Sequence, residues 1–362
     1  MKILITGNMG YVGPAVVRQL RGSMPDAVLV GYDAGFFGHA LTTHLATPER
    51  LLDRQVFGDV RSLRPQDVEG YDAVVALAAV SNDPMGEQFA RVTHAINQEA
   101  AVRTARMAAQ AGVRNFVFAS SCSVYGVAGD EPVRETDPTA PMTAYARSKL
   151  GTEQELADLD GDMAITCLRF ATACGMSDRL RLDLVLNDFV ASALAKGHIE
   201  ILSDGTPWRP LIDVADMARA IEWGIVRSPD QGGRYLVVNA GAEEGNYQVL
   251  DLALAVEAAL PGTTIGVAQD APADSRSYRV DFSLFRSLAP THQPVTRLTD
   301  SIHNLVTGLR GIGFRDPDFR NSRMIRLNVL RRQIAEHLLL EDLSWADGAP
   351  AVRPALQPEV VS

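Results

Sequence analysis

The sequence predicts an α/β fold, with a doubly wound parallel sheet and a smaller C-terminal α/β lobe. Three observations support this prediction. Short β-branched runs alternate with longer helical patterns through the first half of the chain, which is typical of βαβ units. A glycine-rich turn follows the first of these runs directly. The length of 362 residues is enough for a large body and a second lobe.

The first lobe is predicted to occupy residues 1–170. Amphipathic helical patterns separate its strands, and the longest of them runs from about Phe89 to Gln110. This alternation predicts a Rossmann-type sheet, and segments near 207–240 are candidates to return to it. The strands are expected at residues 2–6, 27–32, 73–77, 115–119 and 164–170.

The rest of the chain falls into three parts. Residues 171–315 show a looser pattern and are predicted to form the smaller, substrate-binding lobe. Residues 316–347 have helical periodicity with arginines on the polar side, and the Pro-rich end, 348–362, is predicted to be a loose tail. We interpret these arginines as a solvated helix face. The alternatives are that the extension covers the second lobe or extends a subunit interface.

The composition excludes several classes of protein. No apolar run approaches the ~20 residues of a membrane span, and a strand begins at once, which leaves no room for a signal peptide. We therefore expect a cytoplasmic protein that does not bind membranes. The net charge of −10 disfavours nucleic acid as a partner. The three cysteines have neither disulfide nor metal-site spacing, so no metal is expected.

The glycine-rich turn predicts a dinucleotide site. Gly7, Gly10 and Gly13 permit a tight turn, close approach of a pyrophosphate and close helix packing, with the helix N-terminus facing the anion. Asp33 ends the next strand, where a carboxylate can accept ribose hydroxyls. That carboxylate would repel a 2′-phosphate, and the two residues after it are not arginines, so NAD is favoured over NADP. The alternative is a tight turn without a ligand.

A tyrosine and a lysine four residues apart indicate acid–base chemistry. Tyr145 and Lys149 share one face of a predicted helix, so the ammonium can lower the pKa of the phenol. An unperturbed phenol titrates near pH ~10, and such help would let it act as a base near neutral pH. The alternative is an ordinary surface pair.

In combination, these motifs and the Ser-rich strand end "ASSCSVYG" resemble the extended short-chain dehydrogenase/reductase family. The resemblance is strongest to its NAD-dependent nucleotide-sugar epimerases and dehydratases and covers residues 1 to about 310. It implies that Ser121 hydrogen-bonds the reacting sugar hydroxyl, that Tyr145 moves the hydroxyl proton, and that Lys149 also holds the nicotinamide ribose. It also implies a homodimer, formed through helices near 87–110 and 144–159.

The predicted site has a cofactor part and a substrate part. For NAD we expect Gly7, Met9, Gly10, Tyr11, Val12, Gly13, Asp33, Asp59, Val60, Leu77, Ala78, Ala79, Asn97, Ala119, Tyr145, Lys149 and Phe170. For the nucleotide-diphosphate sugar we expect Ser121, Cys122, Ser123, Thr172, Asn187, Arg209 and Arg276. By resemblance, Arg209 and Asn187 meet the diphosphate and Asn97 supports the active-site helix. Arg276 would add a second forked cation.

The residues after Ser121 discriminate within the family. The 4,6-dehydratases have Asp and Glu where this chain has Cys122 and Ser123, so dehydration is disfavoured. Enzymes of the 3,5-epimerase and fucose-synthase type carry a catalytic cysteine at the place of Ser123. Cys122 is one residue out of register, which turns its side chain to the other face of a strand, and we expect a packed thiol.

The set that remains is Ser121, Tyr145, Lys149 and NAD, which is sufficient for reversible oxidation at one sugar carbon. This set predicts an NAD-dependent epimerase that acts at C4 of the sugar through a transient ketone. The galactose-type 4-epimerases have a substrate-binding asparagine where this chain has Thr172, so the identity of the sugar stays open. The alternatives are a nucleotide-sugar 4-ketoreductase or dehydrogenase and, less favoured, a dehydratase or a non-catalytic NAD-binding protein.

Overall fold

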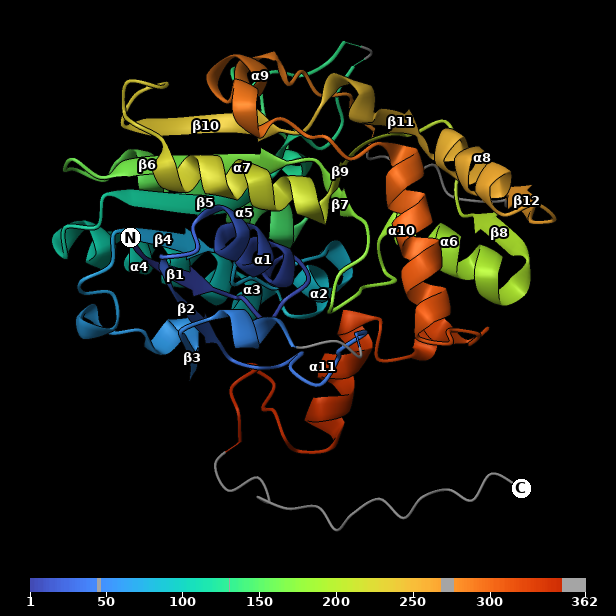
Figure 1. Ribbon diagram of the computed structural model, residues 1–362, viewed down its shortest axis with the longest axis horizontal. Coiled ribbons are helices and arrows are strands. Elements are labelled where there is room, and N and C mark those ends of the chain that lie inside the picture. The colour runs from blue at the N-terminus through green and yellow to red at the C-terminus, as the bar shows by residue number, and fades with distance from the viewer. Residues whose placement is uncertain (44–46, 130, 268–276, 347–362) are drawn as a thin grey trace.

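Seven parallel strands form the central sheet, in the order β10-β6-β5-β4-β1-β2-β3 (Figure 1). The structure is a computed structural model that describes residues 1–43, 47–129, 131–267 and 277–346. The five predicted strands agree with it to within two residues at each end, and β3 and β10 are additional, with β10 inside the 207–240 segment that was a candidate to return to this sheet. The bounds are Lys2–Thr6 (β1), Val28–Asp33 (β2), Arg54–Phe57 (β3), Ala73–Ala76 (β4), Asn115–Ser121 (β5), Ala164–Phe170 (β6) and Tyr235–Ala240 (β10).

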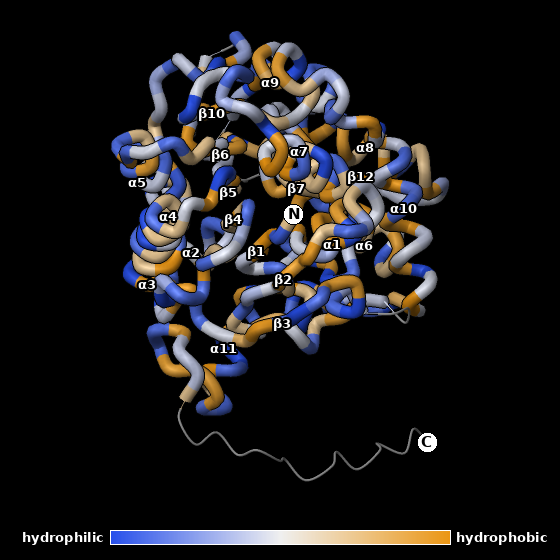
Figure 2. Tube along the Cα trace, turned by 60° about the vertical axis from the view of Figure 1, so that its left-hand side comes forward, coloured by the Kyte–Doolittle hydropathy of each residue, from blue (hydrophilic) through white to orange (hydrophobic). Residues whose placement is uncertain are grey.

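Helices cover both faces of this sheet. One face packs against α1 (Gly13–Ser23) and α7 (Val214–Val226), and the other packs against α4 (Ala101–Gln110) and α5 (Ala144–Ala157). Strand β1 shows why both faces are apolar. Ile3 and Ile5 enter the core on the α1 side and Leu4 enters the opposite core, since successive side chains of a strand alternate. Figure 2 shows apolar residues along β1 and β2 and mixed residues on α4.

The helix expected from Phe89 to Gln110 is not continuous. It is divided into α3 (Ala90–His94), a π-helical segment (Ala95–Ala100) and α4, and a separate short helix, α2 (Asp83–Gln88), precedes it. The wider π turn carries Asn97, whose side chain hydrogen-bonds the backbone of Val80 and the hydroxyl of Ser148. A π turn of this kind is often found beside a functional site. Helices α4 and α5, expected in a dimer contact, pack against each other; the homodimer stays a prediction.

The second lobe lies beyond the carboxyl ends of the strands (Figure 1). It contains two small sheets, and β10 returns the chain to the central sheet, where it pairs in parallel with β6. The small sheets are β11 (Asn246–Gln248), β9 (Trp208–Asp213) and β7 (Thr172–Cys174), and β12 (Thr264–Val267) with β8 (His198–Ile201). The helices of this lobe are α6 (Val185–Lys196), α8 (Val249–Ala259) and α10 (Leu298–Gly311), whereas α9 (Ser283–Leu288) lies beside β10 of the central sheet.

The C-terminal extension differs from the prediction in two ways. Its helix, α11 (Arg326–Ala335), is short, and a tight turn in which Leu339 pairs with Trp345 follows it. The interpretation as a solvated basic face is wrong for Arg326, which is 1% exposed and stacks on the ring of Phe37 at 4.5 Å. Arg331 and Arg332 do lie in solvent. In the described part of the chain, no helix combines the length and apolarity of a bilayer span.

Candidate active site

A cavity of about 680 Å³ opens at the carboxyl ends of the strands. It lies at the point where the strand order reverses, between β1 and β4, with strands β2 and β3 on one side and β5, β6 and β10 on the other. In open α/β sheets this crevice is where ligands bind. Residues from both lobes and from the C-terminal extension line it, so the cavity extends from the glycine-rich turn to the second lobe.

The glycine-rich turn forms one wall of this cavity. Gly7 has φ 76°, and a Cβ atom there would lie 2.5 Å from the backbone nitrogen of Ala78. A Cβ on Gly13 would lie 2.1 Å from the carbonyl oxygen of Asn8. None of the described side chains caps the start of α1, and Pro14 lacks an N–H. The remaining amides and the positive end of the helix therefore fit the pyrophosphate of a dinucleotide.

Asp33 stands at the end of β2, as predicted. Its carboxylate accepts hydrogen bonds from the backbone N–H groups of Met9, at 2.9 Å, and Gly35, at 2.7 Å. Burial raises its pKa, and these two bonds counteract that rise. The carboxylate is thus held in place at the cavity wall, where it can accept ribose hydroxyls.

The other predicted cofactor residues also gather here, with two exceptions. Met9 contributes its backbone to Asp33 rather than a side chain to the wall, and Asn97 lies behind it and supports the chain at Val80. The residues that line the cavity are Gly7, Gly10, Tyr11, Val12, Gly13, Asp33, Asp59, Val60, Leu77, Ala78, Ala79, Ala119, Tyr145, Lys149 and Phe170. In the described residues, no cluster of three or more His, Cys, Asp or Glu could hold a metal ion.

Ser121, Tyr145 and Lys149 come together at the centre of the cavity. The side chain of Ser121, at the end of β5, hydrogen-bonds Tyr145, and Lys149 donates a hydrogen bond of 2.7 Å to the carbonyl oxygen of Ala119. The Lys149 ammonium is 5.6 Å from the centroid of the Tyr145 ring. The two side chains share one face of α5, as their spacing predicts.

The charges of this group depart from the prediction. Burial raises the pKa of Tyr145 to about 12, and the groups that lower it are Ser121 and Arg181 rather than Lys149. Burial also lowers the pKa of Lys149 to about 7. Desolvation thus outweighs the attraction that was expected between phenolate and ammonium.

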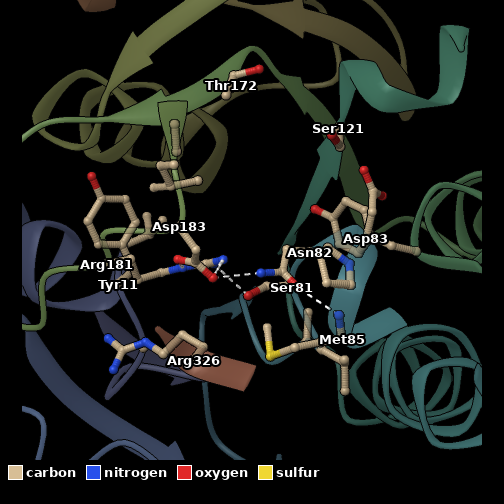
Figure 3. A pocket seen from close by; sticks show the side chains of 18 of the residues that line it. Tyr11, Ser81, Asn82, Asp83, Met85, Ser121, Thr172, Arg181, Asp183 and Arg326 are labelled. Atoms are coloured by element: carbon tan, nitrogen blue, oxygen red, sulfur yellow. Dashed lines mark hydrogen bonds and ion pairs between the residues drawn. The ribbon is translucent and has the colours of Figure 1, made fainter. Parts of the chain in front are cut away.

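A buried ion pair that the sequence did not suggest lies beside the catalytic group (Figure 3). Arg181 binds Asp183 through two hydrogen bonds and donates a third, of 2.8 Å, to the hydroxyl of Ser81. Asn82 donates to Asp183 at 2.6 Å and accepts from the backbone of Met85 at the start of α2. The sequence signal that could have indicated this ion pair is the presence of two arginines, Arg179 and Arg181, in the segment after β7.

The predicted substrate residues divide into two groups. Ser121, Ser123, Thr172 and Arg209 line the cavity, and the hydroxyl of Ser123 is buried without a hydrogen-bond partner among the described residues. Arg276 lies outside the described residues.

Cys122 and Asn187 do not line the cavity. The Cys122 thiol is buried behind the wall against the carbonyl oxygen of Arg169, and burial raises its pKa, as expected for a packed thiol. The Asn187 amide is fully occupied by Gly175, Tyr11 and the backbone of Arg181. It therefore braces the wall and leaves no free group for a diphosphate.

Comparison with known proteins identifies the class. Residues 3–241 match the NAD dependent epimerase/dehydratase family, and because this is more than half of the chain, the chain belongs to that family. The NAD dependence of that family agrees with the glycine turn and with Asp33, and the neighbour MoeE5 has been solved with NAD bound.

Several relatives are 4-epimerases. The chain is 27% identical over 244 residues to UDP-arabinose 4-epimerase 1 of Arabidopsis thaliana, which covers 60% of this chain and 58% of that protein. The chain thus spans well under two thirds of the length of this relative. It is also 27% identical over 267 residues to UDP-glucose 4-epimerase of Corynebacterium glutamicum, covering 68% of this chain and 76% of the other.

Solved structures share the fold. MoeE5 in complex with UDP-glucose and NAD has a TM-score of 0.69 and 27% identity, covering 86% of this chain and 99% of the other. TunA, an NAD-dependent NDP-hexosamine 5,6-dehydratase, has a TM-score of 0.74 at 22% identity, covering 88% and 99%. The second likeness concerns the fold alone.

Proposed function

We propose that the chain is an NAD-dependent epimerase of a nucleotide-diphosphate sugar, acting at C4 through a transient ketone. The observation that carries this proposal is the convergence of Ser121, Tyr145 and Lys149 in a cavity that continues from Asp33 to Arg209. The first part of that cavity fits NAD, and the remainder is lined by residues of the second lobe. The 4-epimerases among the relatives support the same reaction.

The chain's own groups account for the proton chemistry. Bound NAD would supply a hydride acceptor that returns the hydride to the same carbon. As phenolate, Tyr145 can take the proton of the substrate hydroxyl while the carbon is oxidised and give it back on reduction, and the hydrogen bond from Ser121 and the charge of Arg181 favour this deprotonated form. Lys149 is kept beside Tyr145 by its bond to Ala119. The atoms balance, since no proton, hydride or water is gained or lost overall.

Arg209 and Ser123 would orient the substrate. Arg209 lines the cavity from β9 and would bind a phosphate group through its guanidinium. Ser123 offers a buried hydroxyl without a partner among the described residues, next to Ser121. A buried polar group of this kind is stabilised when a ligand hydroxyl bonds it.

The residues that follow Ser121 in the cavity wall disfavour dehydration. It would need an acid and a base after Ser121, and Cys122 is a buried thiol that points to the carbonyl oxygen of Arg169. A 4-ketoreductase or dehydrogenase remains the alternative. It would release its product with a net change in the cofactor.

The test begins with binding. In a thermal-shift screen with NAD and UDP-, dTDP-, GDP-, CDP- and ADP-sugars, we expect one class to raise the unfolding temperature, because a ligand of the folded state stabilises it by mass action. The best binder is then followed by NMR. Accumulation of the C4 epimer without net NADH supports the proposal, whereas stoichiometric NADH, or a requirement for added NADH, supports the alternative.

The catalytic assignment has its own control. Tyr145→Phe is expected to lower kcat by 10²-fold or more, on the order of the contribution of a general base. Tyr71→Phe, in a half-buried tyrosine beside Lys2, is the matched control and should leave kcat unchanged. Equal activity of the Tyr145 variant and the wild type would refute the role of Tyr145.

A further inference from the structure

The C-terminal extension, residues 316–346, forms part of the cavity wall. It contributes Arg320, Arg326, Leu330 and Leu343. Leu330 and Leu343 are 2% and 0% exposed, so these two apolar side chains pack into the core behind the wall and hold the extension against the first lobe. The match to the family ends at residue 241, and it therefore does not account for this part of the site.

Two bonds attach the extension to the loop that follows Asp33. Gln333 donates a hydrogen bond of 3.0 Å to the carbonyl oxygen of Phe36, and the indole N–H of Trp345 donates one of 2.7 Å to that of Ala34. The rings of Trp345 and Phe36 also pack at 5.8 Å. The extension is thus tied to the loop next to the carboxylate that fits the adenosine ribose.

A second set of bonds ties the extension to two more walls. Arg61 donates to the carbonyl oxygen of Asp342 at 2.7 Å and pairs with Asp59, which lines the cavity after β3. At the other end, Arg320 pairs at 2.7 Å with Asp188 on α6, another lining residue. The extension therefore connects the adenosine end of the cavity to the second lobe. Figure 1 shows this segment in red along the lower side of both lobes.

The turn after α11 holds Leu343 in an unusual backbone conformation. Its φ is 61°, in the left-handed region, which costs an L-residue on the order of 1 kcal/mol. Asp342 accepts hydrogen bonds from the backbone and hydroxyl of Ser344, and Leu340 bonds Ser344 and Leu343 through the backbone. These bonds fix the turn so that the Leu343 side chain stays in the core behind the cavity wall.

We propose that the extension, held in place by the buried Leu330 and Leu343, covers the adenosine end of bound NAD, so that the cofactor leaves only when the extension moves. This inference rests on the proposed function only in that NAD occupies the cavity. A covered cofactor suits a reaction that returns the hydride and keeps NAD between turnovers. A dehydrogenase has to release its cofactor in every cycle.

The test uses the full chain loaded with NADH and measures release of NADH by its fluorescence after dilution. The double variant Leu343→Ser/Trp345→Ala is expected to release NADH at least about tenfold faster than the wild type, because it loses apolar packing and a hydrogen bond that hold the extension against the loop after Asp33. The matched control is Leu340→Ser, in the same turn but 53% exposed and not in the wall, with no change expected.

A folded double variant that releases NADH at the wild-type rate would overturn the proposal. If that variant does not fold, hydrogen exchange of residues 336–346 in the wild type decides, because bound NAD should slow it; equal exchange with and without NAD would equally overturn the proposal. Neither readout requires sugar turnover. A chain that retains NADH behind the extension but epimerises no nucleotide sugar would therefore contradict only the proposed function.

Discussion

The guanidinium of Arg181 holds the carboxylate of Asp183 through two hydrogen bonds of 2.9 and 3.0 Å, and both side chains are nearly closed to solvent. This pair joins the segment after β7 to Ser81 and Asn82, which follow β4. It therefore connects two walls of the cavity. Arg181 also lowers the pKa of Tyr145 by its charge, so one residue affects both the stability of the site and its chemistry.

Arg181→Met is expected to lower the free energy of unfolding by about 3–5 kcal/mol, since it leaves the Asp183 carboxylate buried and unpaired. It should also move the rising limb of the pH–rate profile to higher pH, because Tyr145 loses a group that lowers its pKa. Denaturant unfolding and a pH series measure the two effects. Arg181→Lys keeps the positive charge and should shift the rising part of the pH–rate profile less than Arg181→Met does. If the wild type and both variants have the same rising part, the electrostatic role of Arg181 is refuted.

Lys149 predicts a pH-dependent stability in the NAD-free protein. Its pKa is about 7 in the folded state and 10.5 as a model group, so between these values the unfolded state binds more protons. Unfolding free energy should therefore rise with pH above about 7, by a few kcal/mol if the whole window is crossed. Below about pH 7 the cost of burying the charged lysine is present in full.

Lys149→Met removes this titration and is the comparison that isolates it. Its advantage in stability over the wild type should be largest near pH 6 and should shrink towards pH 9, as measured by chemical unfolding. Tyr145 does not interfere in this range, since its pKa is about 12 in the folded state. A constant difference between the two proteins from pH 6 to 9 would contradict the burial of a titrating lysine.

The turn that faces the pyrophosphate can be tested with two glycines of similar backbone conformation. Gly7 and Gly70 have φ values of 76° and 72°, but a Cβ on Gly7 would meet the Ala78 backbone at 2.5 Å and one on Gly70 would meet nothing within 4 Å. Gly70→Ala should cost on the order of 1 kcal/mol of stability and leave NAD binding unchanged. Gly7→Ala should weaken NAD binding by tenfold or more, measured by calorimetry. Similar affinities for NAD in the two variants would exclude Gly7 from the cofactor site.

The strand end at Ser121 and Cys122 separates a catalytic hydroxyl from a packed thiol. Ser121→Ala should lower kcat by roughly 10²-fold, because it removes the hydroxyl that holds Tyr145. Cys122→Ala should change kcat less than threefold and cost about 1–2 kcal/mol of unfolding free energy through lost packing. Steady-state kinetics on the substrate found by the binding screen measures both. Loss of activity in the cysteine variant alone would reverse the assignment.

Much of the cofactor half could be predicted from local patterns. A glycine turn between an apolar run and a helix has few structural solutions, and the acid at the end of the next strand follows from the parallel βαβ geometry. The four-residue spacing of Tyr145 and Lys149 is likewise a property of one helix. These features are encoded within short windows, so Gly7, Asp33 and the Tyr–Lys pair all line the cavity.

Other features were missed because their signals are weak or distant. Strand β3 has four half-exposed or exposed residues and no apolar run, so it has no periodic signal. The segment expected as one helix from Phe89 to Gln110 does bury its apolar side chains. Its backbone hydrogen bonds, however, change to the wider π-helical pattern at Ala95–Ala100, and the spacing of apolar side chains does not reveal such a change. The burial of Asn187 also depends on Tyr11, far away in the sequence.

By itself, the sequence determined five strands of the sheet, the dinucleotide turn and the catalytic helix, because each is specified by neighbouring residues. Only the tertiary structure decided which charges meet in the cavity. It brought Arg181 and Asp183 beside Tyr145, and it buried Arg326 on Phe37 although the helix pattern predicted a solvated arginine. The physical reason is that burial and ion pairing depend on contacts between distant segments, and desolvation then sets the pKa values of Tyr145 and Lys149.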